Sequence, residues 1–234
     1  MPSSAAIAEF TRRVRDEWLP AYCADPARNY SVNGFRSTSV RVSEVDAVDC
    51  MRAIDHRVVT DHGGGRYKAP RSTVREVLFW EGLRNIAPRP ITLWIEPVIT
   101  MAAAARLNLD YGWPKGAIGL QSKKWGFDFV AYASPESDQE HIVGEVKKTD
   151  RELQKLISDL KCLSGESNGP SGEQGGASPN SRKKWDELLQ RKPPILWALG
   201  PAGAGAVFAV TYPQEHCAVL TEATHSVLNY PNAA

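Results

Sequence analysis

The residues of this chain whose types and spacing could do chemistry are Asp128, Glu145 and Lys147. Side chains of an extended strand alternate between its two faces, so Glu145 and Lys147, which are two residues apart, point to the same side. Asp128 stands between Phe127 and Phe129, in an apolar segment where an uncompensated charge would be costly. The pattern therefore predicts two acids and one ammonium that need partners inside the fold.

A divalent cation is the partner that this arrangement favours. A polar turn over 133–140 would let the two strands pair and bring Asp128 close to Glu145, where the two carboxylates would repel each other. Mg²⁺ prefers hard oxygen ligands and is usually held by one or two carboxylates together with waters and phosphate oxygens. Lys147 would then orient a polarised water or stabilise negative charge that builds on phosphorus.

Strands and a helix are expected to position these groups. The helix is expected over 150–163, where leucines and isoleucines recur at helical spacing behind a capping box of Thr149 and Glu152. Runs of apolar residues predict strands over 117–121, 126–132 and 141–147.

Upstream of these strands the sequence predicts two more helices. Thr73 and Glu76 match a second capping box, which predicts a helix over 72–86. A strand over 91–96 and a helix over 97–107 follow it.

The chain continues beyond the charged strand with an insertion and a return to the core. Residues 164–181 are rich in Gly, Ser, Pro and Asn, and they are expected to form a flexible insertion because few apolar side chains offset the entropy cost of ordering them. A short helix is expected over 183–191, and buried strands over 195–199 and 206–212.

This order of elements resembles the PD-(D/E)XK nuclease superfamily, which includes restriction endonucleases and Holliday-junction resolvases. The resemblance rests on GFDFVAY at 126–132 and HIVGEVKK at 141–148, although Phe127 stands where the motif has proline. It implies an α/β protein with a restriction-endonuclease-like mixed β-sheet flanked by helices. Residues 71–234 would form this core, and residues 1–70 an N-terminal extension of unknown fold.

The resemblance also implies roles for individual residues. Asp128, Glu145 and Glu96 would hold Mg²⁺ or Mn²⁺, and Lys147 would assist the attacking water. Gln154, on the helix after the Lys147 strand, would supply a further polar group. Two residues compete for the position of the upstream acid, Glu96 and Glu81; the order of acid, helix and strand favours Glu96.

The expected function is that of a Mg²⁺-dependent endonuclease that hydrolyses phosphodiester bonds in nucleic acid, with DNA preferred. Restriction, phage defence or mobile-element processing would be its setting, and a homodimer would fit the habit of the family. The alternative is a catalytically inactive module of the same fold that binds nucleic acid or a protein partner.

Composition limits the other classes. The net charge of +1 neither supports nor excludes a nucleic-acid partner, and no apolar run approaches the roughly 20 residues that span a bilayer, so a cytoplasmic protein is expected. The four separated cysteines and five histidines lack zinc-ligand spacing. Local support for nucleic acid comes from basic clusters and their neighbouring tryptophans: Lys123-Lys124, Lys147-Lys148, Arg182-Lys183-Lys184, Trp125 and Trp185.

Overall fold

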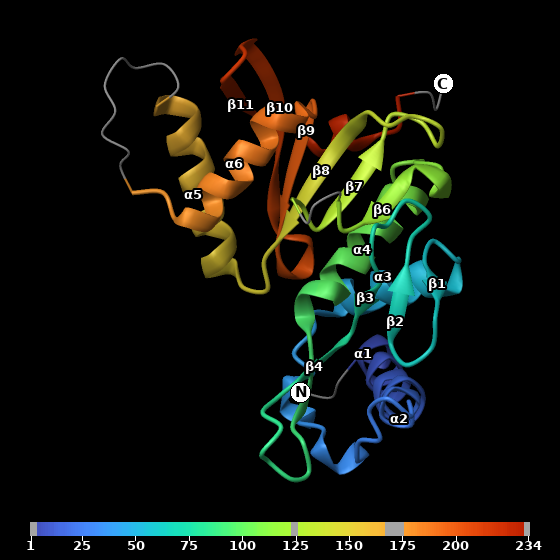
Figure 1. The fold of residues 1–234 in the computed structure, drawn as a ribbon. Coiled ribbons are helices and arrows are strands. Elements are labelled where there is room, and N and C mark those ends of the chain that lie inside the picture. The colour runs from blue at the N-terminus through green and yellow to red at the C-terminus, as the bar shows by residue number, and fades with distance from the viewer. Residues whose placement is uncertain (1–3, 123–125, 167–175, 232–234) are drawn as a thin grey trace.

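A six-stranded mixed sheet forms the centre of the protein in a computed structural model that describes residues 4–122, 126–166 and 176–231 (Figure 1). Its strand order is β11-β10-β9-β8-β7-β6, in which β8 and β9 are parallel and the other neighbours antiparallel. The strands are β6 (Ile118–Leu120), β7 (Phe129–Tyr132), β8 (Glu140–Val146), β9 (Ile195–Leu199), β10 (Gly205–Gln214) and β11 (Cys217–Ala223). The expected mixed sheet flanked by helices is confirmed.

Helices cover both faces of this sheet with their apolar sides. One face packs on α4 (Ile95–Leu109) through side chains such as Phe129, Ile142 and Trp197. The other face packs on α5 (Asp150–Glu166) and α6 (Pro179–Arg191), which lie side by side in Figure 1. The buried strands have apolar residues on both faces because each face meets a helix.

The helix after β8 begins where the sequence predicts. Thr149 Oγ1 accepts a hydrogen bond from the backbone N–H of Glu152 at 3.2 Å, which is the N-cap half of the predicted capping box. The expected insertion is shorter than 164–181, since α5 extends to Glu166 and α6 starts at Pro179, behind the N-cap Ser178. The segment 167–175 lies outside the described residues.

The helix predicted over 72–86 is wrong. The segment is extended instead, as β3 (Glu76–Val77) and β4 (Phe79–Glu81), and β4 pairs with β5 (Ile91–Leu93). Thr73 does not cap a helix, because its hydroxyl donates to the carbonyl of Gln121 at 2.9 Å and joins this segment to the end of β6. A tertiary hydrogen bond thus replaces the local one.

The N-terminal region is mostly helical. It contains α1 (Ala5–Arg12), a π-helical segment (Arg13–Trp18), α2 (Leu19–Cys23) and α3 (Glu44–Asp55). A small sheet follows, in which β2 (Arg66–Lys68) lies between β1 (Thr60–Asp61) and β3. Short 3-10 turns complete the described chain at Val32–Gly34, Ser37–Ser39, Lys115–Ala117, Pro201–Gly203 and His225–Leu228.

This region shares a core with the sheet. Phe10, Val14 and Cys50 belong to the same buried cluster as the apolar side chains of α4 and as Trp197 of β9. The predicted extension, 1–70, therefore packs directly on the layer that supports the sheet. Within the described residues, no helix combines the length and the apolar character needed to cross a bilayer.

Candidate active site

The register of β7 and β8 places Asp128 opposite Glu145. Phe129 pairs with Gly144 in antiparallel register, and one further step along both strands brings Asp128 to Glu145. The N–H of Asp128 donates to the carbonyl of Gly144 at 2.9 Å, and the N–H of Val146 donates to Asp128 Oδ2 at 2.7 Å. Directly opposed residues share a sheet face, so both carboxylates lie on the side covered by α5 and α6.

Gly144 allows this close pairing. A Cβ atom at Gly144 would stand 1.9 Å from the ring of Phe129, so the ring occupies the space that any larger residue would need. The packing fixes the strand pair immediately beside the two acids.

Glu145 is engaged by two ammonium groups. Lys147 Nζ lies 2.6 Å from Glu145 Oε1, and Lys184 Nζ, from α6, lies 2.5 Å from Oε2. Lys184 also donates to the carbonyl of Gly126 at 2.7 Å. Glu145 is only 4% exposed, and a buried carboxylate needs such partners.

The site raises the pKa of both Asp128 and Lys147. Burial and the negative charge of Glu145 raise the pKa of Asp128 from 3.8 to about 7, despite the opposing charges of Lys184 and Lys147 and the hydrogen bond from Val146. Burial lowers the pKa of Lys147, but the charge and hydrogen bond of Glu145 outweigh it, and the net shift is upward. A cation is therefore retained on Lys147, while Asp128 titrates near neutrality.

A hollow of about 380 Å³ opens beside Asp128, which is not part of its lining, and is lined by Glu145 and Lys147. Glu96, in the first turn of α4, lines it together with Glu145 and Lys147. The indole N–H of Trp94 donates to Glu96 Oε2 at 3.0 Å and orients this carboxylate. The remaining wall comes from α5 and the start of α6, including Glu152, Lys155, Ser181 and Lys184.

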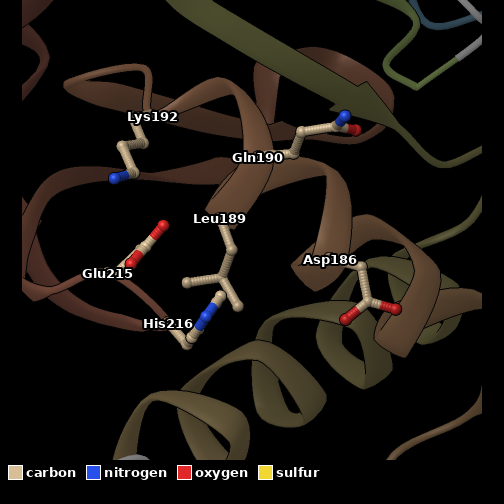
Figure 2. A pocket seen from close by; sticks show the side chains of 6 residues that line it. All are labelled: Asp186, Leu189, Gln190, Lys192, Glu215 and His216. Atoms are coloured by element: carbon tan, nitrogen blue, oxygen red, sulfur yellow. The ribbon is translucent and has the colours of Figure 1, made fainter.

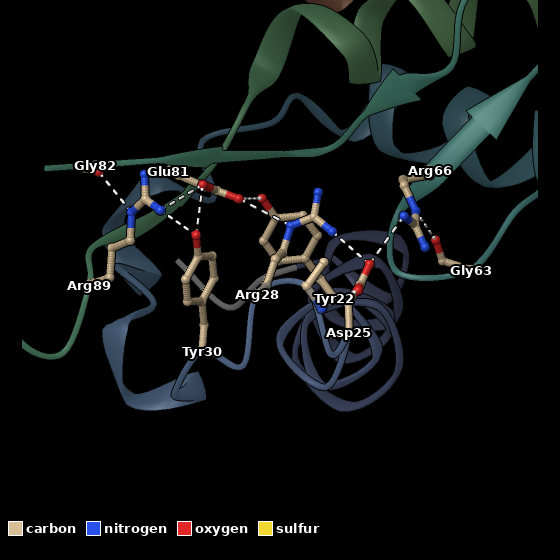
Figure 3. Close-up of polar contacts among 10 residues, drawn as sticks. Tyr22, Asp25, Arg28, Tyr30, Gly63, Arg66, Glu81, Gly82 and Arg89 are labelled. Atoms are coloured by element: carbon tan, nitrogen blue, oxygen red, sulfur yellow. Dashed lines mark hydrogen bonds and ion pairs between the residues drawn. The ribbon is translucent and has the colours of Figure 1, made fainter. Parts of the chain in front are cut away.

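Glu81 does not line this hollow; it lies in a separate network of hydrogen bonds and ion pairs (Figure 3). It accepts hydrogen bonds from Tyr22 at 2.6 Å, Tyr30 at 3.0 Å and Arg28 at 3.1 Å, and it forms an ion pair with Arg89 at 2.9 Å. Burial opposes ionisation, but the hydrogen bonds from Tyr22, Tyr30 and Arg28 and the charge of Arg89 lower the pKa of Glu81 overall. Of the two upstream acids, Glu96 is thus the one that lines the hollow.

Gln154 does not line the hollow. It is exposed on α5, whereas Glu152, Lys155 and Leu156 of the same helix line it. Residues three or four apart share a helix face, and Gln154 therefore points away from the face of Glu152, Lys155 and Leu156.

Glu76, which the sequence predicts to be part of a helix cap, is a buried acid near the site. It is 5% exposed, and Gln121 Nε2 donates to its Oε1 at 2.9 Å. Burial, with a smaller contribution from the charge of Glu96, raises the pKa of Glu76 from 4.5 to about 7. Its signal in the sequence was a carboxylate flanked by Val74, Val77 and Leu78, a pattern equally typical of a helix face.

The residues of the predicted basic clusters lie in different environments. Lys147 and Lys184 line the hollow, whereas Lys148 is 53% exposed and 3.7 Å from Glu152. Trp185 is buried against the sheet and is therefore not free to stack on a base. The cluster Lys123-Lys124 and Trp125 lies outside the described residues.

The carboxylates of this site fit a divalent cation that takes only some of its ligands from the protein and the others from water and the substrate. In the part of the chain that the structure describes, no three His, Cys, Asp or Glu side chains form a closed metal site. Asp128 and Glu145 offer two hard carboxylates, and Mg²⁺ commonly takes one or two of these with waters and phosphate oxygens. Burial is the largest cause of the raised pKa of Asp128, and repulsion from Glu145, the second cause, is what a bound cation would relieve.

A second hollow lies at the far end of α6 (Figure 2). Its lining includes Asp186, Leu189, Lys192, Glu215 and His216. Asp128, Glu145 and the two lysines that contact Glu145 are not part of this lining.

Comparisons of the chain with protein-family models, curated proteins and solved structures gave no match.

Proposed function

We propose that this protein is a Mg²⁺- or Mn²⁺-dependent nuclease of the restriction-endonuclease-like type that hydrolyses phosphodiester bonds, with DNA as the preferred substrate. The observation that carries the proposal is the opposed pair of Asp128 and Glu145, with Lys147 on the same sheet face and 2.6 Å from Glu145. Glu96 lines the same hollow as Glu145 and Lys147.

Each residue has a role that follows from its contacts. Asp128 and Glu145 would hold the cation, which when bound supplies charge for polarising water and neutralising phosphate oxygens. Lys147 keeps its proton at Nζ because of Glu145, so it can donate to a phosphate oxygen or to the attacking water. Glu96 lines the same hollow and would accept a hydrogen bond from a water there.

The state of Asp128 makes the activity dependent on pH. Its pKa of about 7 means that the group loses its proton as pH rises through neutrality, and only the ionised form is a good cation ligand. Cleavage at limiting cation concentration should therefore increase between about pH 6 and 8.

The test is incubation of the purified chain with supercoiled, linear and single-stranded DNA and with RNA, each with Mn²⁺, Mg²⁺ or a chelator. The proposal expects cleavage of DNA that requires the cation and stops with chelator. Cleavage that persists in chelator, or no cleavage of any of these substrates, contradicts it.

One observation favours the second candidate, a catalytically inactive binding module of the same fold. Both oxygens of Glu145 already have an ammonium partner, Lys147 on one and Lys184 on the other. A binding module would retain this neutralised arrangement, and it predicts nucleic-acid or protein binding that is indifferent to Mn²⁺ and to chelator.

A further inference from the structure

Lys184 has a position that the resemblance did not assign. It comes from α6, beyond the insertion, and its ammonium lies 2.5 Å from the same carboxylate that Lys147 contacts. Glu145 carries one negative charge and meets two ammonium groups, so a cation that takes Glu145 would leave an ammonium for another anion. Ammonium groups form strong charge-assisted hydrogen bonds with phosphate oxygens, and phosphate is the anion that the proposed function brings there.

We propose that Lys184 is a second phosphate-binding lysine, which leaves Glu145 for a phosphate oxygen of the substrate when a divalent cation takes Glu145. This inference rests on the proposed function, because the exchange requires the cation. It assigns Lys184 a direct contact with the substrate and gives α6 a part in the active site.

The contacts of Lys184 explain how it can change partner without leaving the hollow. An ammonium has three N–H donors, and one of them is held by the carbonyl of Gly126 at 2.7 Å. That carbonyl lies on the segment that leads into Asp128, and the ammonium also lies 5.5 Å from the centre of the Phe127 ring. When Glu145 turns to a cation, Gly126 keeps the ammonium in place with its other donors available.

The helix that carries Lys184 is firmly anchored. Trp185 and Leu188 are buried in the core between α6 and the sheet. Ser178 caps the first turn, and Ser181 donates to the buried Asp159 of α5 at 2.7 Å. The ammonium is thus delivered by a rigid element, as precise phosphate binding requires.

Lys155 provides a matched control. It lines the same hollow from α5, but its side chain is 60% exposed and lies 3.3 Å from Asp159, a carboxylate outside the proposed cation site. Lys155 and Lys184 therefore differ in their contact with Glu145 while sharing charge and neighbourhood.

The experiment measures two quantities on Lys184→Met and Lys155→Met: Mn²⁺ affinity by calorimetry without substrate, and DNA cleavage at saturating Mn²⁺. For Lys184→Met we expect Mn²⁺ affinity to rise about tenfold, because a competing cation has left Glu145, while kcat falls about 10²-fold. Lys155→Met should leave the Mn²⁺ affinity within about threefold of wild type, because the Lys155 ammonium pairs with Asp159 and does not compete for Glu145. Lys184→Gln, which retains a donor for Gly126, should show the same opposite changes.

The contrary results are distinct. If Lys184 only props Glu145, both Mn²⁺ affinity and cleavage fall together in Lys184→Met and Lys184→Gln, and the inference is overturned. Unchanged kcat in both variants also overturns it. A wild-type protein that neither binds Mn²⁺ nor cuts DNA rejects the proposed function first, and the exchange with it.

Discussion

The positions of Asp128, Glu145 and Lys147 could be predicted from local sequence patterns alone. The alternation of side chains along a strand was enough to place Glu145 and Lys147 on one face, and the turn between the strands was enough to place Asp128 near them. For Lys184 the sequence predicts only membership of a basic cluster, because no local pattern specifies which residue of α6 will contact Glu145. Gln154 was carried over from family resemblance, and the helix turns it away from the hollow.

The pKa of Asp128 has a consequence for stability. The folded state holds the proton up to about pH 7, whereas the unfolded chain releases it near 3.8. The folded protein therefore binds more protons than the unfolded chain between these values, and this group lowers the free energy of unfolding as pH rises through that window.

We predict that Asp128→Asn removes this loss. The variant should gain stability relative to wild type as pH rises from about 5 to 7, by about 3 kcal/mol, and the difference should level off above that range. Urea unfolding of both proteins across this range measures it. A difference that stays constant with pH would mean that Asp128 ionises normally.

At the scale of elements, the prediction succeeded where local signals decide and failed where tertiary contacts do. Helix α5 follows its capping box, and β9 matches the predicted 195–199 because its apolar residues are buried on both faces. The helix predicted over 72–86 failed because Thr73 bonds to the end of β6. Strand β11 was not predicted, since only part of it is buried and its apolar pattern is weak.

Arg106 of α4 forms the buried ion pairs that connect this helix to α3. This buried side chain donates to Asp49 at 2.7 Å and to Asp46 at 2.9 Å, and Asp46 also accepts from the N–H of Ala202 at 2.6 Å. One guanidinium thus links the N-terminal helices, the helix that carries Glu96 and the turn after β9.

We expect Arg106→Ala to lower the free energy of unfolding by about 3–5 kcal/mol, because it removes the buried cation that pairs with Asp46 and one of the two cations that pair with Asp49. Arg52→Ala is the control: Arg52 pairs with Asp49 and Asp110 but its side chain is 34% exposed, so the loss should be about 1 kcal/mol or less. Both values come from denaturant titration. Equal losses would show that burial of the pair has no special cost.

At the scale of the whole molecule, the N-terminal region and the sheet form one continuous core on the α4 side. The sequence predicts an extension of unknown fold, because the apolar residues of 20–70 follow neither helical nor strand spacing clearly. In the structure, Phe10, Trp18 and Tyr67 are buried with the apolar side chains of α4. The helix that brings Glu96 to the hollow is therefore supported from both sides.

A chain limited to residues 71–234 should consequently fail to fold cooperatively. Removing the first 70 residues would expose the buried surface of α4, and the fragment should bind a hydrophobic dye and unfold without a sharp transition. Calorimetry of the fragment beside the full chain measures this. A sharp transition at the temperature of the full chain would show that the sheet and its three helices suffice.

The most direct test of the central claim is cleavage of supercoiled DNA by Lys147→Ala with Mn²⁺ present. Lys147 contacts Glu145 at 2.6 Å, whereas its neighbour Lys148 is exposed, so Lys148→Ala is the matched control. We predict that Lys147→Ala reduces cleavage about 10²-fold or more while its unfolding transition stays cooperative, and that Lys148→Ala cleaves like wild type. Full cleavage by a folded Lys147→Ala protein would contradict the account.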